Sequence, residues 1–174
     1  MGRDSARPGP RKRKGGGMMT IKAIPVNEEN FKPFGTYTKV VKGEGRTGTG
    51  GWECWMTPGL CMEHPAGLGY TMVGGMPLEV DSMEVHNLTT EMLMCGDKPI
   101  VLAVADSDPH GTGAKAEDIR AFLISPGEIV VLKKGIWHDA CRGADGDSYY
   151  YFMARNLEPA VFVPIIGEPV LVEL

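Results

Sequence analysis

Residues 126–138, Pro-Gly-Glu-Ile-Val-Val-Leu-Lys-Lys-Gly-Ile-Trp-His, carry the clearest fold signal in the chain. A turn signal at Pro126-Gly127 precedes the run Ile129–Leu132, whose β-branched side chains are typical of a buried strand. Gly135 permits a tight turn, after which Trp137-His138 resumes an extended chain. We therefore predict a strand, a turn and a second strand, with His138 at a strand end beside the turn.

The same pattern of short strands and turns recurs along most of the chain, at a spacing of roughly 8–12 residues that is typical of all-β sandwiches and barrels. One brief helix is predicted after Asn27, a good N-cap residue, with Phe31 and Phe34 on its buried side. The candidate strands cover residues 21–24, 52–56, 69–74, 78–86, 91–95, 99–105, 119–124, 128–133, 148–154 and 160–164.

Composition indicates one globular domain. The 174 residues are 43% hydrophobic and 23% charged, which are values of ordinary soluble domains. No apolar run reaches the roughly 20 residues of a membrane span, and no secretory leader is visible. The four cysteines, which form no CxxC pair, are expected to be reduced thiols in a cytoplasmic protein; they are Cys54, Cys61, Cys95 and Cys141.

Charge is distributed unevenly. Residues 1–17 hold six Arg and Lys against the single Asp4, whereas the whole chain has a net charge of −4. The basic stretch is rich in Gly and Pro, so we interpret residues 1–19 as a disordered tail ahead of a single domain at 20–174. The domain itself is acidic, which argues against nucleic acid as a partner; a membrane partner is not expected either.

A second informative stretch is Met83-Glu84-Val85-His86, followed by Glu91. On a strand, Glu84 and His86 share one face because side chains repeat every two residues. A turn over residues 87–90 would bring Glu91 back towards His86. With His138 these side chains offer two imidazoles and two carboxylates, a ligand set suited to Zn, Mn, Ni or Fe. We predict a divalent metal site formed by His86, Glu91 and His138, with Glu84 as fourth ligand.

These two stretches resemble the two motifs of the cupin superfamily, with Glu84 in place of a usual histidine and Lys133 in place of a usual proline. Within that superfamily the chain most resembles the ureidoglycolate lyase family. The resemblance rests on three runs in the same order: Met83-Glu84-Val85-His86, Arg120-Ala121-Phe122 and Gly135-Ile136-Trp137-His138. The opening over residues 24–35 is also similar.

The resemblance implies a cupin-type antiparallel β-barrel and a metal-assisted lyase that releases glyoxylate and urea from a small hydroxy-carboxylate. Glu84, His86 and His138 would be the catalytic residues. Arg120, Lys133 and Trp137 are the candidate substrate-binding residues, with Arg120 as a bidentate carboxylate clamp. A homodimer is expected, since cupins commonly pair through sheet edges.

Two other functions are compatible with the same residues. The first is a different metal-dependent enzyme, such as an isomerase, epimerase or dioxygenase acting on a sugar acid or keto acid. The second is a cupin that binds a small ligand without catalysis. Each substrate-binding residue also has a structural alternative: Arg120 as a surface cross-strand partner, Lys133 as a solvated turn residue and Trp137 as a core residue.

Overall fold

The computed structural model describes residues 18–40, 46–47, 53–54, 66–155 and 161–174. Residues 1–17 of the tail predicted over 1–19 lie outside the described residues, as do Cys61 and most of the candidate strand at 52–56, whereas Met19 already belongs to the first strand. Helices are short: the longest described one, α1, has four residues, far below the roughly 20 that a membrane-spanning helix needs.

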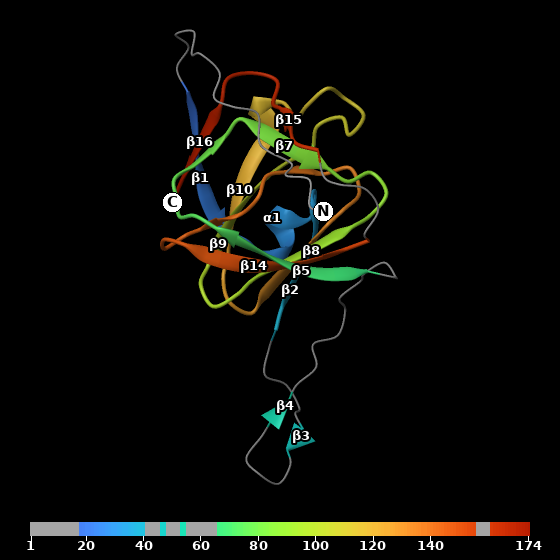
Figure 1. Cartoon of the computed structure of the whole chain (residues 1–174), viewed down its shortest axis with the longest axis vertical. Helices are drawn as coiled ribbons and strands as arrows, with labels where there is room; N and C mark the ends of the chain where they lie inside the picture. The colour runs from blue at the N-terminus through green and yellow to red at the C-terminus, as the bar shows by residue number, and fades with distance from the viewer. Residues whose placement is uncertain (1–17, 41–45, 48–52, 55–65, 156–160) are drawn as a thin grey trace, which may run out of the picture.

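A nine-stranded sheet forms one side of the molecule (Figure 1). Its order is β15-β7-β12-β9-β10-β1-β16-β6, and β13 pairs with β9 at the side. Most pairs are antiparallel, but β1 runs parallel to both β10 and β16. The strands are β1 (Met19–Pro25), β6 (Leu78–Val80), β7 (Ser82–Val85), β9 (Ile100–Ala105), β10 (Ile119–Ile124), β12 (Trp137–His138), β13 (Arg142–Gly143), β15 (Val163–Pro164) and β16 (Val170–Glu173).

A five-stranded antiparallel sheet faces the first, in the order β2-β11-β8-β14-β5. The strands are β2 (Gly35–Lys39), β5 (Gly67–Val73), β8 (Glu91–Cys95), β11 (Glu128–Leu132) and β14 (Ser148–Ala154). A separate two-stranded pair, β3 (Arg46–Thr47) with β4 (Glu53–Cys54), lies beyond the end of β2. The remaining elements are α1 (Glu28–Phe31) and the 3-10 turn η1 (Ala116–Asp118).

Two hydrophobic cores lie on opposite faces of the nine-stranded sheet. The barrel core lies between the two sheets and takes residues from both, among them Leu102, Phe122, Leu93 and Val130. The outer core takes residues of the nine-stranded sheet and its loops, among them Trp137 and Val172. Alternate residues of β9 and β10 therefore enter different cores, which explains why both strands are buried throughout except at Arg120 and Leu123.

The predicted helix forms where its capping signal places it. The Asn27 side chain accepts hydrogen bonds from the backbone N–H groups of Glu29 and Asn30, and the Asn30 side chain accepts one from the N–H of Asn27. This capping box orients α1 so that Phe31 is fully buried, with its ring centroid 5.2 Å from that of Phe122. The helix therefore packs against the barrel core beside β10.

The all-β fold with a minor N-terminal helix is confirmed, with local differences: the pairing is antiparallel as predicted except for the two parallel pairs of β1. The predicted strand at 78–86 divides at Asp81 into β6 and β7, because β6 pairs with β16 whereas β7 pairs with β12 and β15. Four described strands were not predicted: β2, β3, β13 and β16. All four are short, and each is defined by its pairing with a partner strand: β11, β4, β9 and β1 respectively.

Candidate metal centre

Strand pairing brings three of the four predicted ligands to one end of the barrel. His138 of β12 pairs directly with Glu84 of β7, so the two side chains share the face that lies towards the barrel core. His86, two residues beyond Glu84, continues on that face. The facing sheet supplies the fourth ligand, because Glu91 is the first residue of β8. The predicted return of Glu91 towards His86 is therefore observed.

The four side chains converge within contact distance. His138 Nε2 lies 3.1 Å from Glu91 Oε2 and 3.4 Å from Glu84 Oε1. His86 Nε2 lies 3.3 Å from the same Glu91 oxygen and 4.0 Å from Glu84 Oε2. The two imidazole rings are 5.2 Å apart between centroids. Residues from two sheets thus form one carboxylate–imidazole cluster, the name used below for Glu84, His86, Glu91 and His138.

Backbone groups orient the His138 ring and connect the two histidine segments. His138 Nδ1 lies 3.1 Å from the carbonyl oxygen of Ile136. Since a carbonyl only accepts, Nδ1 must donate, and in the neutral ring Nε2 is then a lone pair directed into the cluster. The His86 carbonyl accepts a 2.9 Å hydrogen bond from the N–H of Gly135, which has the positive φ of 81° that favours glycine. The predicted turn therefore joins the two histidine segments.

Electrostatics inside the cluster are strong. Burial alone would raise the pKa of Glu91, but hydrogen bonding and attraction to His138 and His86 lower it to about 2. Burial alone would lower the pKa of His138, yet Glu84 and Glu91 raise it well above its ordinary value. Without a metal ion, the ionised Glu91 carboxylate and the protonated His138 imidazole therefore form a buried ion pair.

The donor set fits a divalent cation. Three buried cluster atoms have no hydrogen-bond partner outside the cluster among the described residues: Glu84 Oε2, Glu91 Oε2 and His138 Nε2. The ligand atoms of Glu84, His86 and His138 all lie within 4.8 Å of one another, and Glu91 Oε2 lies closer still to both imidazoles. Four ligand atoms around one zinc-like ion, each about 2.1 Å from it, would stand roughly 3.4 Å apart. The nitrogen–oxygen distances of 3.1–4.0 Å inside the cluster are close to this spacing.

Comparison with known proteins identifies the family. Residues 70–161 match the family model described as ureidoglycolate lyase, which is more than half of the chain. The chain belongs to the ureidoglycolate lyase family. No curated protein matches the chain. Among solved structures, RmlC from Streptococcus suis in complex with dTDP-D-xylose is similar at 9% identity and a TM-score of 0.37, over 54% of this chain and 45% of that one.

The match to the ureidoglycolate lyase family includes all three runs that suggested it, from Met83 to His138, whereas the similar opening at 24–35 lies outside the matched residues. It also contains the complete carboxylate–imidazole cluster. The family is therefore assigned on the segment that forms the candidate centre.

Two of the three predicted substrate-binding residues, Trp137 and Lys133, make contacts away from the cluster. The Trp137 indole lies in the outer core, on the opposite face from His138, and its Nε1 donates to the carbonyl of Asp108. Lys133 Nζ donates to the carbonyls of Lys32 and Pro33 at the end of α1. Trp137 therefore has a core role and Lys133 a capping role, because strand alternation and the end of β11 direct them away from the cluster.

Arg120 faces the same side of the sheet as His138 but lines a different cavity. On β9, Val104 pairs with His138 on one side and with Arg120 on the other. Two strand spacings, roughly 10 Å, therefore separate the backbones of Arg120 and His138. The structure thus separates Arg120 from the four cluster residues that the sequence grouped with it.

The sequence did not single out two residues near the cluster. Burial raises the pKa of the Cys141 thiol well above its ordinary value, and the charge of nearby Glu91 raises it further. Burial likewise raises the pKa of Tyr150, which faces the barrel core from β14, and Cys141, Glu91 and Glu84 add to the shift. Both groups remain protonated beside the carboxylates. Tyr150 is the middle one of three consecutive tyrosines on β14, and strand alternation turns it to the opposite face from its two neighbours; no local signal marked Cys141.

Proposed function

We propose that this protein is a metal-assisted ureidoglycolate lyase, which converts ureidoglycolate to glyoxylate and urea. The observation that carries the proposal is the convergence of ligand atoms of Glu84, His86 and His138, all within 4.8 Å of one another, inside the segment that matches the family. Imidazole and carboxylate donors gathered at one point are the ligand set of a divalent metal site.

His86, His138 and Glu91 would hold the ion, with Glu84 as fourth ligand or as proton acceptor. A bound divalent ion would supply Lewis-acid stabilisation of negative charge on the substrate's hydroxyl and carboxylate oxygens. Nitrogen and oxygen donors suit Zn, Mn, Ni or Fe. The protonated Cys141 thiol provides no thiolate, so the site has no soft ligand that would favour zinc over the others.

Glu84 is the best-placed proton acceptor for the reaction. Its Oε2 atom is buried and unpaired, whereas Oε1 lies near His138. Transfer of the substrate hydroxyl proton to Glu84 Oε2 lets the C–O bond become the glyoxylate carbonyl as the C–N bond breaks. The released urea nitrogen then takes a proton, so atoms and charge balance without a further reactant.

Side-chain exposure indicates where substrate would enter. The exposed fraction falls from 25% for His86 to 13% for Glu84, 10% for Glu91 and 4% for His138. The cluster is therefore open on the His86 and Glu84 side and closed behind His138. A substrate would approach past His86, the most exposed side chain of the cluster.

A coupled product assay tests the proposal. Wild-type protein loaded with Mn²⁺ or Zn²⁺ should release glyoxylate and urea in equal amounts from ureidoglycolate, and chelator treatment should remove the activity. Glu84→Gln should reduce kcat by at least about a hundredfold, the usual scale of a lost general base. Glu168→Gln makes the same chemical change at an exposed loop position and should leave the rate unchanged. Absence of both products from the metal-loaded wild type would refute the proposal.

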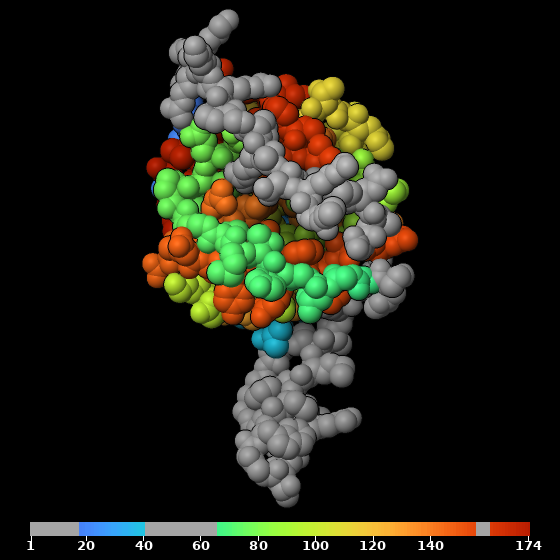
Figure 2. All heavy atoms as spheres, in the orientation of Figure 1, coloured from blue at the N-terminus to red at the C-terminus, as the bar shows by residue number. Residues whose placement is uncertain are grey.

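We also propose that the protein is a homodimer that pairs through β5. This strand is an edge of the five-stranded sheet and carries no charged residue over its seven positions. Its outward side chains Leu68, Tyr70 and Met72 are 64–68% exposed, and β5 lies across the front face of the molecule in Figure 2. Uncharged, exposed edges favour pairing with another strand. Light scattering coupled to size exclusion should give twice the chain mass, and a monomer would contradict this proposal.

A further inference from the structure

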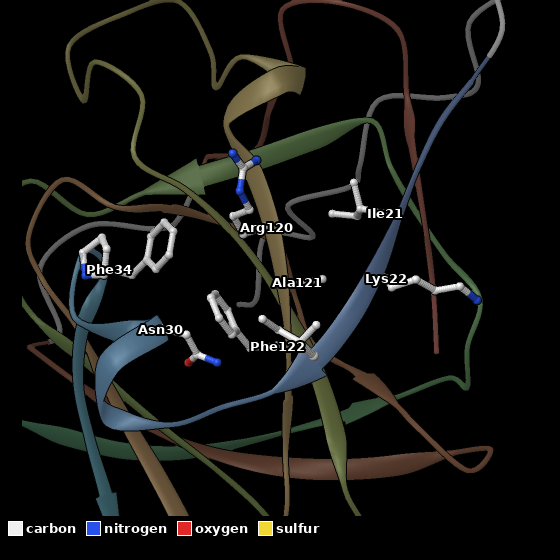
Figure 3. Close-up of a pocket in the computed structure, with 9 residues that line it drawn as sticks. Ile21, Lys22, Asn30, Phe34, Arg120, Ala121 and Phe122 are labelled. Atoms are coloured by element: carbon white, nitrogen blue, oxygen red, sulfur yellow. The ribbon is translucent and has the colours of Figure 1, made fainter.

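A second cavity, of about 560 Å³, lies between β1, α1 and β10 (Figure 3). Its walls are mainly apolar, with the rings of Phe34 and Phe122 packed edge to face at 5.4 Å between centroids. None of the four cluster residues lines it. The lining residues are Ile21, Lys22, Ile24, Asn30, Pro33, Phe34, Arg120, Ala121 and Phe122. We call this space the Arg120 pocket.

Arg120 presents unused donors to the Arg120 pocket. Its Nη1 atom donates to the backbone carbonyls of Glu117 and Ile119, at 2.9 and 2.8 Å. These bonds hold the guanidinium at the start of β10. No acceptor among the described residues binds Nε or Nη2, and these two atoms form one edge of the planar fork that matches a carboxylate.

The other polar lining residues are already occupied. Lys22 Nζ lies 3.4 Å from Glu173 Oε2 and donates to the Leu174 carbonyl, and in Figure 3 its side chain points away from Arg120. The Asn30 amide donates to the Pro25 carbonyl, and its oxygen accepts from Asn27. No Asp or Glu lines the cavity. A single positive charge, not balanced by an acidic residue of the lining, therefore lies at the edge of a mainly apolar cavity.

We propose that the Arg120 pocket binds an organic carboxylate with an apolar, planar body, at a site separate from the carboxylate–imidazole cluster. The Nε/Nη2 edge would bind the carboxylate in a bidentate manner, and the rings of Phe34 and Phe122 would contact the body. One guanidinium matches one negative charge, which favours a monoanion over a phosphate dianion. Ureidoglycolate does not fit this description, because its body is small and polar throughout.

Titration with benzoate tests the proposal without using the lyase reaction. Isothermal calorimetry or ligand-observed NMR on the full chain, with and without chelator, should detect benzoate binding in both conditions. Benzamide, which has the same shape without the charge, should bind at least tenfold more weakly. Phenyl phosphate should also bind more weakly, which separates a carboxylate site from a general anion site.

Two variants locate the binding. Arg120→Gln should weaken benzoate binding at least tenfold, and Arg120→Lys should also weaken it because lysine lacks the planar fork. Lys22→Gln removes one positive charge from the same rim and should change the affinity less than twofold. Thermal melting checks that each variant is folded. The proposal is overturned if wild type does not bind benzoate, if benzamide or phenyl phosphate binds equally well, or if both Arg120 variants retain wild-type affinity. None of these results depends on glyoxylate release, so they leave the proposed lyase activity untouched.

Discussion

The carboxylate–imidazole cluster and the Arg120 pocket lie on one row of one sheet, yet their chemistry differs. Direct strand pairs connect Glu84 to His138, His138 to Val104, and Val104 to Arg120. All four side chains therefore face the same side. At one end of the row, carboxylates and imidazoles are buried and close together. At the other end, one guanidinium is exposed above an apolar wall.

Burial and neighbours account for this difference more than residue type does. Glu91 approaches His138 from the facing sheet, and the ligand atoms of the cluster contact one another in a largely buried space. No acidic residue lines the space around Arg120, which leaves its guanidinium available to an external anion. Val104, buried in the barrel core, separates the two regions. We therefore expect substitutions in the carboxylate–imidazole cluster to change metal binding, and substitutions at Arg120 to change binding of an organic carboxylate.

The largest effect is expected for His138→Asn. This substitution keeps a polar side chain but removes the Nε2 atom that points into the cluster. Metal content should fall to background, and kcat/KM for ureidoglycolate should fall about a thousandfold or more, since metal stabilisation of charge contributes several kcal/mol. Metal analysis and the glyoxylate assay measure both effects. His110→Asn, at an exposed loop position, is the control; wild-type metal content in His138→Asn would place the ion elsewhere.

Glu91→Gln should have the next largest effect, and it should depend on pH. In chelated protein the folded-state pKa of Glu91 is about 2, below its ordinary value of 4.5. The carboxylate therefore contributes stability that is fully present above about pH 4.5 and is lost as the pH falls towards 2. Urea unfolding at neutral pH should show a loss on the order of 3 kcal/mol for the variant.

The stability difference between wild type and Glu91→Gln should shrink as the pH is lowered through this window. A difference that stays constant from pH 6 to pH 3 would mean that the ionised carboxylate is not stabilised by the two histidines.

A smaller effect is expected for Trp137→Phe, on the face opposite to His138. The variant loses the hydrogen bond to the Asp108 carbonyl and part of a buried ring, which together should cost about 2 kcal/mol of unfolding free energy. Metal content should not change. Loss of metal in a folded Trp137→Phe protein would show instead that the indole positions the cluster.

The smallest effect is expected for Lys133→Met, which removes two hydrogen bonds to carbonyls at the end of α1. An exposed interaction of this kind should contribute about 1 kcal/mol. Lys39→Met, at an exposed position on β2, is the matched control. A similar loss of thermal stability in both variants would indicate that Lys133 has no specific capping role.

The sequence predicted the elements whose signals are local. Glu84 and His86 were placed on one face by strand periodicity, Gly135 at the turn by its tolerance of positive φ, and α1 by its Asn27 cap. The family resemblance placed His138 and Glu91 in the same site. Each of these inferences used only spacing along the chain or a known motif.

The sequence could not predict features that depend on long-range pairing. Arg120 was grouped with the cluster because nothing local shows that Val104 lies between Arg120 and His138. Trp137 was expected to bind substrate because one sheet with a core on each face was not anticipated. β16 was also not predicted, because its position depends on its parallel pairing with β1, which is distant in sequence.

Metal titration of chelator-treated protein tests the central claim most directly. Calorimetry with Mn²⁺, Ni²⁺ and Zn²⁺ in turn should show one high-affinity ion per chain for the wild type with at least one of these metals. The double variant Glu84→Gln/His138→Asn should bind none, while Arg120→Gln should bind as wild type does. A wild-type chain that takes up no divalent ion, or a double variant that binds one equally well, would contradict the assignment of the carboxylate–imidazole cluster as a metal centre.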